Sequence, residues 1–293
     1  MALIINGSCE GSVMGKPDFL CIGTQKSGTT WLYENLARHQ EVWTPPIKEF
    51  HYFNRLCMNE QLLGDWGMPV PKRDPMYWNA IKAGKLNDLR WLRNYYEQGL
   101  PKAWYLNLFD EKYTKGRRCG DMTPGYSTLE ERGVSYVRDV VGADTPIILT
   151  IRHPIHRSWS AAKMMFRHYG LEVESEANAD KLIKLLQSPK IMLCSDYTRI
   201  IPTWRKFFGN VHVLTYDELC QDPHGYLGRI SSILNIENKW DKPTIESRVW
   251  SDAKKIVIPA AIQEHLKNQY CEEIQATKKL VNDAYVDQWE KDI

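Results

Sequence analysis

Short apolar runs alternate with longer amphipathic stretches along this chain of 293 residues. Continuous apolar runs are typical of strands buried on both faces of a parallel sheet. The apolar run at 18–23 and the one at 146–151 are the clearest, and further short strands are expected at 41–43, 118–122 and 211–215. The segments between them have helical periodicity at 28–38, 128–141, 154–169, 181–187, 195–208 and 223–234. This alternation predicts an α/β fold, with a central parallel sheet flanked by helices on both faces.

The chain is expected to form one domain over residues 17–293, after a flexible leader at 1–16. Residues 54–117 are rich in aromatic residues and proline, and they are expected to be an irregular insertion with helices near 75–82 and 87–98. A polar, acidic stretch at 171–180 predicts a mobile loop. Pro259 is expected to begin a long C-terminal helix with one apolar stripe. That stripe consists of Ile262, Leu266, Tyr270 and Ile274.

Composition narrows the function classes. With 43% apolar and 25% charged residues the chain is typical of a globular protein. A net charge of +2 argues against a nucleic-acid coat but permits a local basic pocket. No apolar run approaches 18 residues, no secretory signal is visible, and the seven cysteines form no C-x-x-C pair. We therefore expect a cytoplasmic protein with reduced thiols and no membrane partner.

A phosphate-binding loop follows the first apolar run. Gly23 and Gly28 have the G-x-x-x-x-G spacing of a Walker loop, but the lysine, Lys26, lies inside the loop. Loop N–H groups and the start of the following helix can hold an anion there. Thr29 and Thr30 add hydroxyl donors. The displaced lysine indicates an anhydride substrate other than an ordinary Mg-nucleoside triphosphate.

A second anion-binding segment follows the apolar run at 146–151. Where a Walker B strand would end in a metal-binding aspartate, this one ends in Arg152, whose guanidinium suits bidentate phosphate binding. Pro154 suits the first turn of a helix in which Ser160 can add a hydroxyl. Alone, the segment is equally compatible with a helix bearing exposed cations. Paired with the first loop, it indicates a nucleotide with phosphates at both ends of its ribose.

The two segments together resemble a known family. K-S-G-T-T-W at 26–31 and R-x-P-x-x-R-x-x-S at 152–160 are similar to the two PAPS-binding motifs of sulfotransferases, where PAPS is 3′-phosphoadenosine 5′-phosphosulfate. The resemblance implies a P-loop nucleotide-binding fold, the product PAP and no metal. It implies that the first motif holds the 5′ end of the donor and the second the 3′-phosphate. The implied donor-binding residues are Gln25, Lys26, Ser27, Gly28, Thr29, Thr30, Trp31, Arg152 and Ser160.

The segment from Lys48 to Phe53 resembles the K-E-x-H-F-F segment of the heparan sulfate sulfotransferase branch. The resemblance implies that Glu49 is the general base and that His51 is its neighbour, while His51 as the base would give the same reaction class. A base is needed because an acceptor hydroxyl is a weak nucleophile. Lys26 is expected to stabilise the departing oxygen. The alternatives are a surface ion pair of Glu49 with Lys48 and a structural histidine.

Two positions depart from that branch. Asn54 replaces a frequent aspartate, and Met122 replaces a lysine associated with polysaccharide acceptors, so a heparan-type acceptor is in doubt. Thr123 and Tyr126 of the retained Thr-Pro-Gly-Tyr segment are expected to shape the acceptor site. Further on, the resembling family has a basic, glycine-containing loop that closes over the nucleotide. Lys254 and Lys255 can take this role although the glycine is missing, and the alternative is two solvated lysines.

The acceptor is expected to be a small molecule. Aromatic residues of the insertion can line a pocket for an organic or sugar acceptor, although such residues more often belong to a core. The candidates are Trp66, Tyr77 and Trp78. The sequence thus predicts a PAPS-dependent sulfotransferase acting on a hydroxyl or amine of a small-molecule or carbohydrate acceptor. The alternatives are a P-loop kinase using ATP, which requires a Walker lysine and an acidic metal ligand, and a non-catalytic nucleotide-binding protein. The acceptor's identity, O- or N-sulfation and the oligomeric state are left open.

Overall fold

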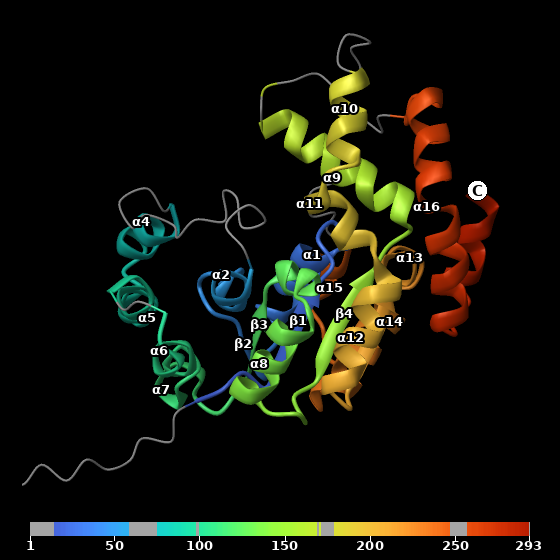
Figure 1. Cartoon of the computed structure of the whole chain (residues 1–293). Coiled ribbons are helices and arrows are strands. Elements are labelled where there is room, and N and C mark those ends of the chain that lie inside the picture. Colours follow the sequence, from blue (N-terminus) through green and yellow to red (C-terminus); the bar gives the residue numbers. More distant parts are fainter. Residues whose placement is uncertain are drawn as a thin grey trace, which may run out of the picture.

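Five parallel strands form the central sheet of the protein, for which a computed structural model describes residues 15–58, 75–97, 100–168, 170, 179–246 and 257–292. The strands are β1 (Phe19–Gly23), β2 (Val42–Trp43), β3 (Arg118–Met122), β4 (Ile147–Ile151) and β5 (Val211–Thr215). Their order across the sheet is β2-β3-β1-β4-β5 (Figure 1). The chain places β2 and β3 on one side of β1, then β4 and β5 on the other, so the order reverses between β1 and β4. Ligands of open α/β sheets bind at such a switch point, beyond the carboxyl ends of the strands.

Helices cover both faces of this sheet, which is why β1 and β4 consist almost entirely of apolar residues. Phe19 and Cys21 pack into one hydrophobic cluster, whereas Leu20 and Ile22 pack into the other, as the alternation of side chains along a strand requires. The helices that contribute to the cluster of Phe19 are α1 (Thr29–Leu36), α13 (Tyr216–Gln221), α14 (Pro223–Leu234) and α15 (Lys242–Glu246). Those on the opposite face include α2 (Tyr52–Cys57), α8 (Glu131–Val141), α9 (Pro154–His168), α12 (Tyr197–Phe207) and α16 (Ala260–Leu280). This arrangement confirms the predicted fold class.

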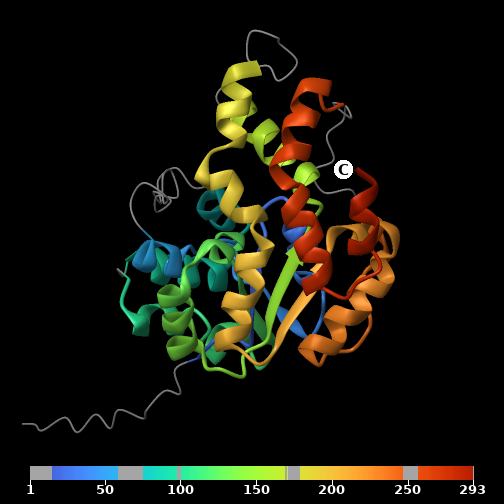
Figure 2. The same ribbon diagram turned by 45° about the vertical axis from the view of Figure 1, so that its right-hand side comes forward.

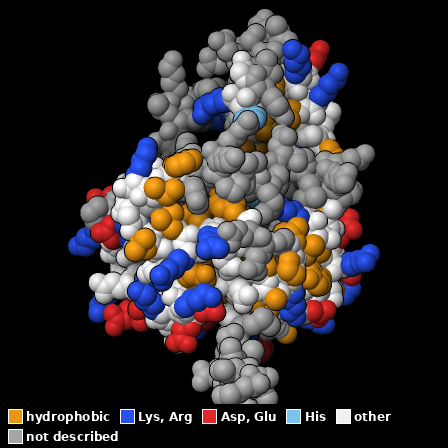
Figure 3. All heavy atoms as spheres, turned by 90° about the vertical axis from the view of Figure 1, so that its left-hand side faces the viewer, with side chains coloured by type: hydrophobic (Ala, Val, Ile, Leu, Met, Phe, Trp, Pro, Cys, Tyr) orange, Lys and Arg blue, Asp and Glu red, His pale blue; other side chains and the backbone are white. Residues whose placement is uncertain are grey.

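The aromatic-rich insertion contributes several helices that gather beside α2 (Figure 1). They are α4 (Pro75–Lys82), α5 (Leu86–Glu97), α6 (Lys102–Asn107) and α7 (Glu111–Thr114). Aromatic side chains of α5 and α6, among them Trp91 and Trp104, are buried in the core. Trp78, Ile81 and Leu86 remain exposed on α4 and α5. On this side of the molecule, hydrophobic side chains lie among lysines and arginines (Figure 3).

A second group of helices stands above the carboxyl edge of the sheet. Helix α9 packs against α10 (Ala179–Leu186) and α16, and the three extend upward together in both ribbon views (Figures 1 and 2). The apolar stripe predicted for the C-terminal helix is buried along its full length. After α16, a 3-10 helix, η5 (Val286–Asp292), ends the described chain.

Most predicted elements are present within one to three residues of their expected bounds. Helix α14 begins where Asp222-Pro223 predicted, because the Asp222 carboxylate accepts the Gly225 N–H at 2.9 Å and caps the helix. The short helices α2, α6, α7, α11 (Pro189–Met192), α13 and α15 were not expected. The leader, apart from its last two residues, and most of the predicted loop at 171–180 lie outside the described residues. No helix in the described ranges has the length and apolar character needed to cross a bilayer.

A glycine in β3 is required by the packing of the sheet, and this can be tested. A β-carbon on Gly120 would lie 2.4 Å from the ring of Phe19, its neighbour in β1. We expect Gly120→Ala to lower the free energy of unfolding by about 1–3 kcal/mol, because the buried ring has little space to move. Urea unfolding measures this. Gly209→Ala is the control, since a β-carbon there meets no atom within 4 Å. Equal stability of the two variants would contradict this account of the packing.

Candidate functional site

The loop after β1 makes a sharp turn that only certain residues tolerate. Gly23 and Gly28 have φ angles of 128° and 85°, and Lys26 has a φ of 72°. Gly28 is the N-cap residue of α1, and a side chain there would come within 2.8 Å of Leu219. The two glycines of the motif are therefore required by the backbone. The turn places Lys26 at the carboxyl edge of the sheet, next to the N-terminus of α1.

Some of the expected donor-binding residues face the interior of the protein. The Ser27 side chain is buried, and its hydroxyl lies 2.8 Å from that of Thr24. The Trp31 indole donates a hydrogen bond of 3.4 Å to the Ile245 carbonyl and packs edge-on against Tyr226. Both residues thus stabilise the loop through contacts in the protein interior. Three other expected residues of the loop and the start of α1, namely Gln25, Lys26 and Thr30, are partly exposed.

The loop and the second anion-binding segment are in direct contact. The Arg152 guanidinium, at the end of β4, donates a 3.0 Å hydrogen bond to the Lys26 carbonyl. Behind this contact the Thr24 N–H donates to the Thr150 carbonyl at 2.7 Å, which extends the pairing of β1 with β4 into the loop. Two segments that lie 126 residues apart in the sequence therefore form one cationic edge.

Arg152 is held by aromatic residues. Its guanidinium lies 4.3 Å from the centre of the Tyr216 ring, within the range of a cation–π contact. The Tyr197 hydroxyl donates to the Arg152 carbonyl at 2.6 Å. Burial raises the pKa of the neighbouring Asp217, while a hydrogen bond from Trp289 and the charge of Arg152 oppose this rise. Trp289 belongs to η5, so the C-terminal segment packs beside Arg152.

The rest of the second motif divides into an internal and a surface part. Arg157 is fully buried, and its guanidinium donates to the Ser195 and Ser158 hydroxyls and to the Ile191 carbonyl. Arg157 therefore ties α9 to the segment that precedes α12. Ser160 is partly exposed in the second turn of α9.

The segment after β2 brings Lys48, Glu49 and His51 together. The Lys48 ammonium lies 2.8 Å from Glu49 Oε1, and His51 Nε2 lies 3.4 Å from Glu49 Oε2. The ion pair that the sequence analysis considered as an alternative is thus present. It does not cover the carboxylate, because 36% of the Glu49 side chain is exposed, against 15% for Lys48. Glu49 is therefore accessible from solvent.

The charge state of Glu49 follows from these neighbours. Burial raises the pKa of this carboxyl, but the hydrogen bond from His51 and the charge of Lys48 outweigh burial and lower the pKa to about 2. Glu49 is consequently ionised throughout the neutral range.

Lys48 also reaches the phosphate-binding loop. Its ammonium lies 3.4 Å from the Thr29 hydroxyl in the first turn of α1. One cation therefore bridges the candidate base and the candidate donor site. From the sequence, Lys48 was expected only as a partner of Glu49, because nothing in the local sequence indicates that this segment lies against α1.

Thr123 and Tyr126 lie deeper than expected for residues that line an acceptor site. Both are fully buried, and their hydroxyls donate to Asp121 at 2.6 and 2.7 Å. Asp121 is fully buried as well. Burial raises its pKa to about 6, although hydrogen bonds from Thr123, Tyr126 and Tyr105 oppose the rise. These residues therefore lie behind the site, and Asp121 was not singled out from the sequence.

Several other expected residues can be placed only in part. Trp78 is 47% exposed on α4. Tyr77 belongs to the same helix, but its side chain is outside the described part of the structure. Trp66, Lys254 and Lys255 lie outside the described residues. The structure therefore leaves these aromatic and basic positions as predictions.

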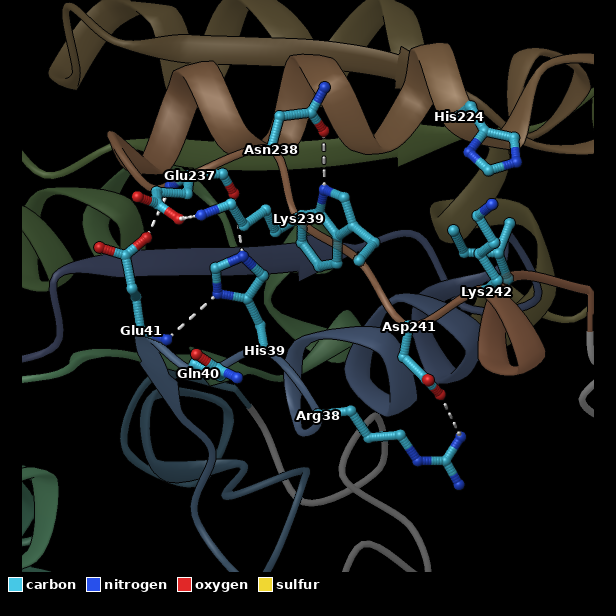
Figure 4. A pocket seen from close by; sticks show the side chains of 12 residues that line it. Arg38, His39, Gln40, Glu41, His224, Glu237, Asn238, Lys239, Asp241 and Lys242 are labelled. Atoms are coloured by element: carbon cyan, nitrogen blue, oxygen red, sulfur yellow. Dashed lines mark hydrogen bonds and ion pairs between the residues drawn. The ribbon is translucent and has the colours of Figure 1, made fainter.

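A polar cavity of about 770 Å³ lies away from this site, near the C-terminal end of α1 (Figure 4). Its lining groups bond to one another: His39 Nε2 donates to the Glu237 carbonyl at 2.9 Å, and the Glu41 carboxylate accepts the Glu237 N–H at 2.6 Å. The phosphate-binding loop is at the opposite end of α1. The cavity is therefore separate from the cationic edge formed by Lys26, Lys48 and Arg152.

Comparison with known proteins agrees with this arrangement. The sequence model of the sulfotransferase family matches residues 17–242, most of the chain. The chain belongs to the sulfotransferase family. The membrane-associated sulfotransferase kil1 of Dictyostelium discoideum is 27% identical over 151 residues, which are 52% of this chain and 23% of that protein. This sulfotransferase chain thus aligns with about a quarter of that relative's length.

Solved sulfotransferase structures share the fold. A sulfotransferase from Alicyclobacillus acidocaldarius has a TM-score of 0.64 at 20% identity, covering 94% of this chain and 99% of that one. The sulfotransferase domain of the Synechococcus PCC 7002 olefin synthase has a TM-score of 0.51 at 16% identity, covering 89% of this chain and 95% of that domain. Family and fold together support sulfuryl transfer in general and do not favour the kinase alternative.

The charge balance at Glu49 makes a prediction that needs no substrate. We expect Lys48→Met to raise the pKa of Glu49 from about 2 toward its ordinary value of 4.5, because an opposing charge is removed. In the wild type, the stabilisation from ionised Glu49 should be present above pH 4.5 and should be lost as pH falls toward 2. Carboxyl-carbon NMR titration measures both effects. Lys279→Met, on the exposed end of α16, is the control and should leave the Glu49 titration unchanged. An unchanged titration in Lys48→Met would refute the proposed charge balance.

Proposed function

We propose that this protein transfers a sulfuryl group from PAPS to a hydroxyl or amine of a small-molecule or carbohydrate acceptor. The observation that carries the proposal is the contact between Arg152 and the Lys26 carbonyl at 3.0 Å. It joins two cationic segments at the switch point of the sheet. The ionised carboxylate of Glu49 lies next to the same edge, one lysine away from Thr29.

The residues present fit a nucleotide with two separate anionic groups. Lys26 and the first turn of α1 offer an ammonium, hydroxyls and helix N–H groups for the 5′ end. Arg152 offers a planar fork of donors for a 3′-phosphate, with Ser160 as a further hydroxyl. The bound donor supplies the sulfuryl group as a mixed phosphate–sulfate anhydride. Lys254 and Lys255, which the family resemblance implies could close over the nucleotide, stay predicted contributors to donor binding.

The hydrogen bonds of His51 favour Glu49 as the base. His51 Nε2 faces the Glu49 carboxylate, and Nδ1 lies 3.2 Å from Asn54 Oδ1. The Asn54 amide orientation is fixed because its nitrogen donates to the Gly125 carbonyl at 2.8 Å. Both ring nitrogens therefore face side-chain oxygens. His51 is engaged on both sides of its ring, whereas the Glu49 carboxylate is partly exposed and can take a proton from an acceptor.

Lys48 links binding of the donor to the strength of this base. In the ligand-free site the charge of Lys48 holds the pKa of Glu49 low. An anion bound beside Thr29 would pair with the same ammonium and offset its positive charge. The pKa of Glu49 would then rise. A stronger base would then be present when the donor is bound. Lys26, on the other side of the loop, would stabilise the charge that develops on the departing oxygen.

The acceptor is expected to approach from the side of the insertion. Glu49 is exposed on the side of the sheet where α2 and the insertion lie, and Trp78 offers an aromatic surface on α4. We propose a small metabolite or sugar as acceptor and a cytoplasmic location for the enzyme.

Binding of PAP, the desulfonated donor, tests the donor site without an acceptor. We expect wild-type protein to bind PAP, and Lys26→Ala and Arg152→Ala each to weaken binding on the order of 10- to 100-fold, because each removes a charge-assisted hydrogen bond. Isothermal titration calorimetry gives the dissociation constants. Lys239→Ala, in the cavity of Figure 4, is the matched control and should bind as the wild type does. PAP binding that is sensitive to Lys239 and not to Arg152 would move the donor site to that cavity.

Turnover tests the base. A screen of hydroxyl and amine acceptors with PAPS, read by the mass gain of one sulfonate, should identify a substrate. With that substrate we expect Glu49→Gln to lower kcat on the order of 100-fold or more, because the amide cannot accept the proton. PAP should bind at least as tightly as to the wild type, because Lys48 no longer pairs with a charged Glu49. An unchanged rate in Glu49→Gln would favour a non-catalytic nucleotide-binding protein. Magnesium-dependent ATP turnover would instead support the kinase alternative.

A further inference from the structure

A buried carboxylate lies directly behind the segment that carries the candidate base. Asp121 is near the end of β3 and pairs in register with Leu20 of β1, at the centre of the sheet. Every hydrogen bond that its carboxylate accepts within the described part of the chain comes from a hydroxyl. The donors are Thr123 at 2.6 Å, Tyr126 at 2.7 Å and Tyr105 at 3.0 Å. All four residues are fully buried.

One of these hydroxyls connects the carboxylate to the candidate active site. Thr123 Oγ1 donates its proton to Asp121 Oδ1 and accepts the Phe50 N–H at 3.0 Å. A hydroxyl has one proton, so donation to the carboxylate turns a lone pair of the same oxygen toward Phe50. Phe50 lies between Glu49 and His51 in the sequence. The position of both side chains therefore depends on this hydrogen bond.

The side chain of Phe50 restrains this residue as well, in addition to the hydrogen bond of its backbone N–H. It is fully buried, with its ring centre 5.7 Å from that of Trp91 and 5.8 Å from those of Tyr95 and Phe109. Backbone and side chain of one residue are thus both fixed. Glu49 and His51 flank this fixed point and pair with each other at the surface.

We propose that Asp121 and Thr123 form a buried anchor that sets the position of Glu49 and His51, and that Thr123 is a positioning residue for the reaction. This inference rests on the proposed role of Glu49 as base. Its physical basis is that a displacement of about 1 Å at a reacting group can lower a rate on the order of 100-fold. Tyr126 and Tyr105 hold Asp121 in place, and Thr123 alone among its hydroxyl partners reaches the Phe50 N–H.

The test compares substitutions that remove different hydrogen bonds of one cluster. Thr123→Val removes the hydroxyl that reaches Phe50, whereas Thr123→Ser retains it. Tyr105→Phe is the matched control, because it removes a hydrogen bond to Asp121 Oδ2 and leaves the link from Oδ1 through Thr123 to Phe50. The readouts are the melting temperature, PAP affinity, kcat, and hydrogen exchange of the Phe50 amide.

We expect Thr123→Val to lower kcat on the order of 10- to 100-fold, to leave the Kd for PAP unchanged and to speed exchange of the Phe50 amide. Thr123→Ser should be close to the wild type in all three. Tyr105→Phe should lower the melting temperature, while kcat falls far less than in Thr123→Val, because Tyr126 still donates to Asp121 Oδ2. A loss of kcat in Tyr105→Phe as large as that in Thr123→Val would overturn the proposal, since the cluster would then act only through general stability.

Two further results keep the test decisive. If Thr123→Val does not fold, the wild-type protein suffices, because an unprotected Phe50 amide would show that the anchor does not hold the segment. If PAP does not bind and no acceptor is found, the proposed function fails. Hydrogen exchange of the Phe50 amide and the NMR chemical shift of the Glu49 carboxyl carbon, compared between the wild type and Thr123→Val, then still decide whether the anchor exists. Conversely, normal PAP binding together with an unprotected Phe50 amide would reject the anchor alone.

Discussion

The pairing of β1 with β4 is the constraint on which the candidate site depends. Gly23 pairs with Leu149 after a register shift that follows Cys21, so the two strands end at the same edge of the sheet and the segments that follow them meet. The Thr24 N–H to Thr150 hydrogen bond and the Arg152 contact with the Lys26 carbonyl continue that pairing beyond the strands. Bringing Arg152 to the loop that carries Lys26 places like charges near one another, an arrangement that a bound polyanion stabilises. A sheet with another strand order would separate these segments and leave two unrelated loops.

Local sequence rules were sufficient for most of the sheet and for the motifs. Strands buried on both faces must be apolar throughout, which is why the run from Phe19 to Ile22 was recognisable. The Asp222 cap and the apolar stripe on α16 are likewise determined by residues that lie close together in the sequence. The family resemblance rested on contiguous motifs, and the family match confirms it. Features set within one turn or one strand were thus predictable from the sequence.

The direction in which a side chain points was not predictable in the same way. Trp31 belongs to the loop motif, yet its indole turns away to the Ile245 carbonyl, which lies 214 residues further along the chain. Thr123 and Tyr126 were expected at the acceptor site, but β3 places them behind it, on Asp121. Lys48 reaches Thr29 because the segment after β2 returns to the first turn of α1. Each outcome depends on a contact between distant segments, on which local periodicity and spacing carry no information.

The contrast between two carboxylates near the base segment explains how their roles differ. Glu49 is partly exposed beside Lys48 and His51, whose charge and hydrogen bond outweigh burial and lower its pKa to about 2. Asp121 lies in the interior among hydroxyls, and burial raises its pKa to about 6. Environments that shift the pKa values of two carboxyl groups in opposite directions commonly give the two groups different roles. A charge that is accessible and paired with mobile cations can respond to a bound anion, and Glu49 has that property. A charge enclosed by fixed hydroxyls cannot respond without disrupting the core, so Asp121 is suited to the proposed anchor and Glu49 to the proposed base.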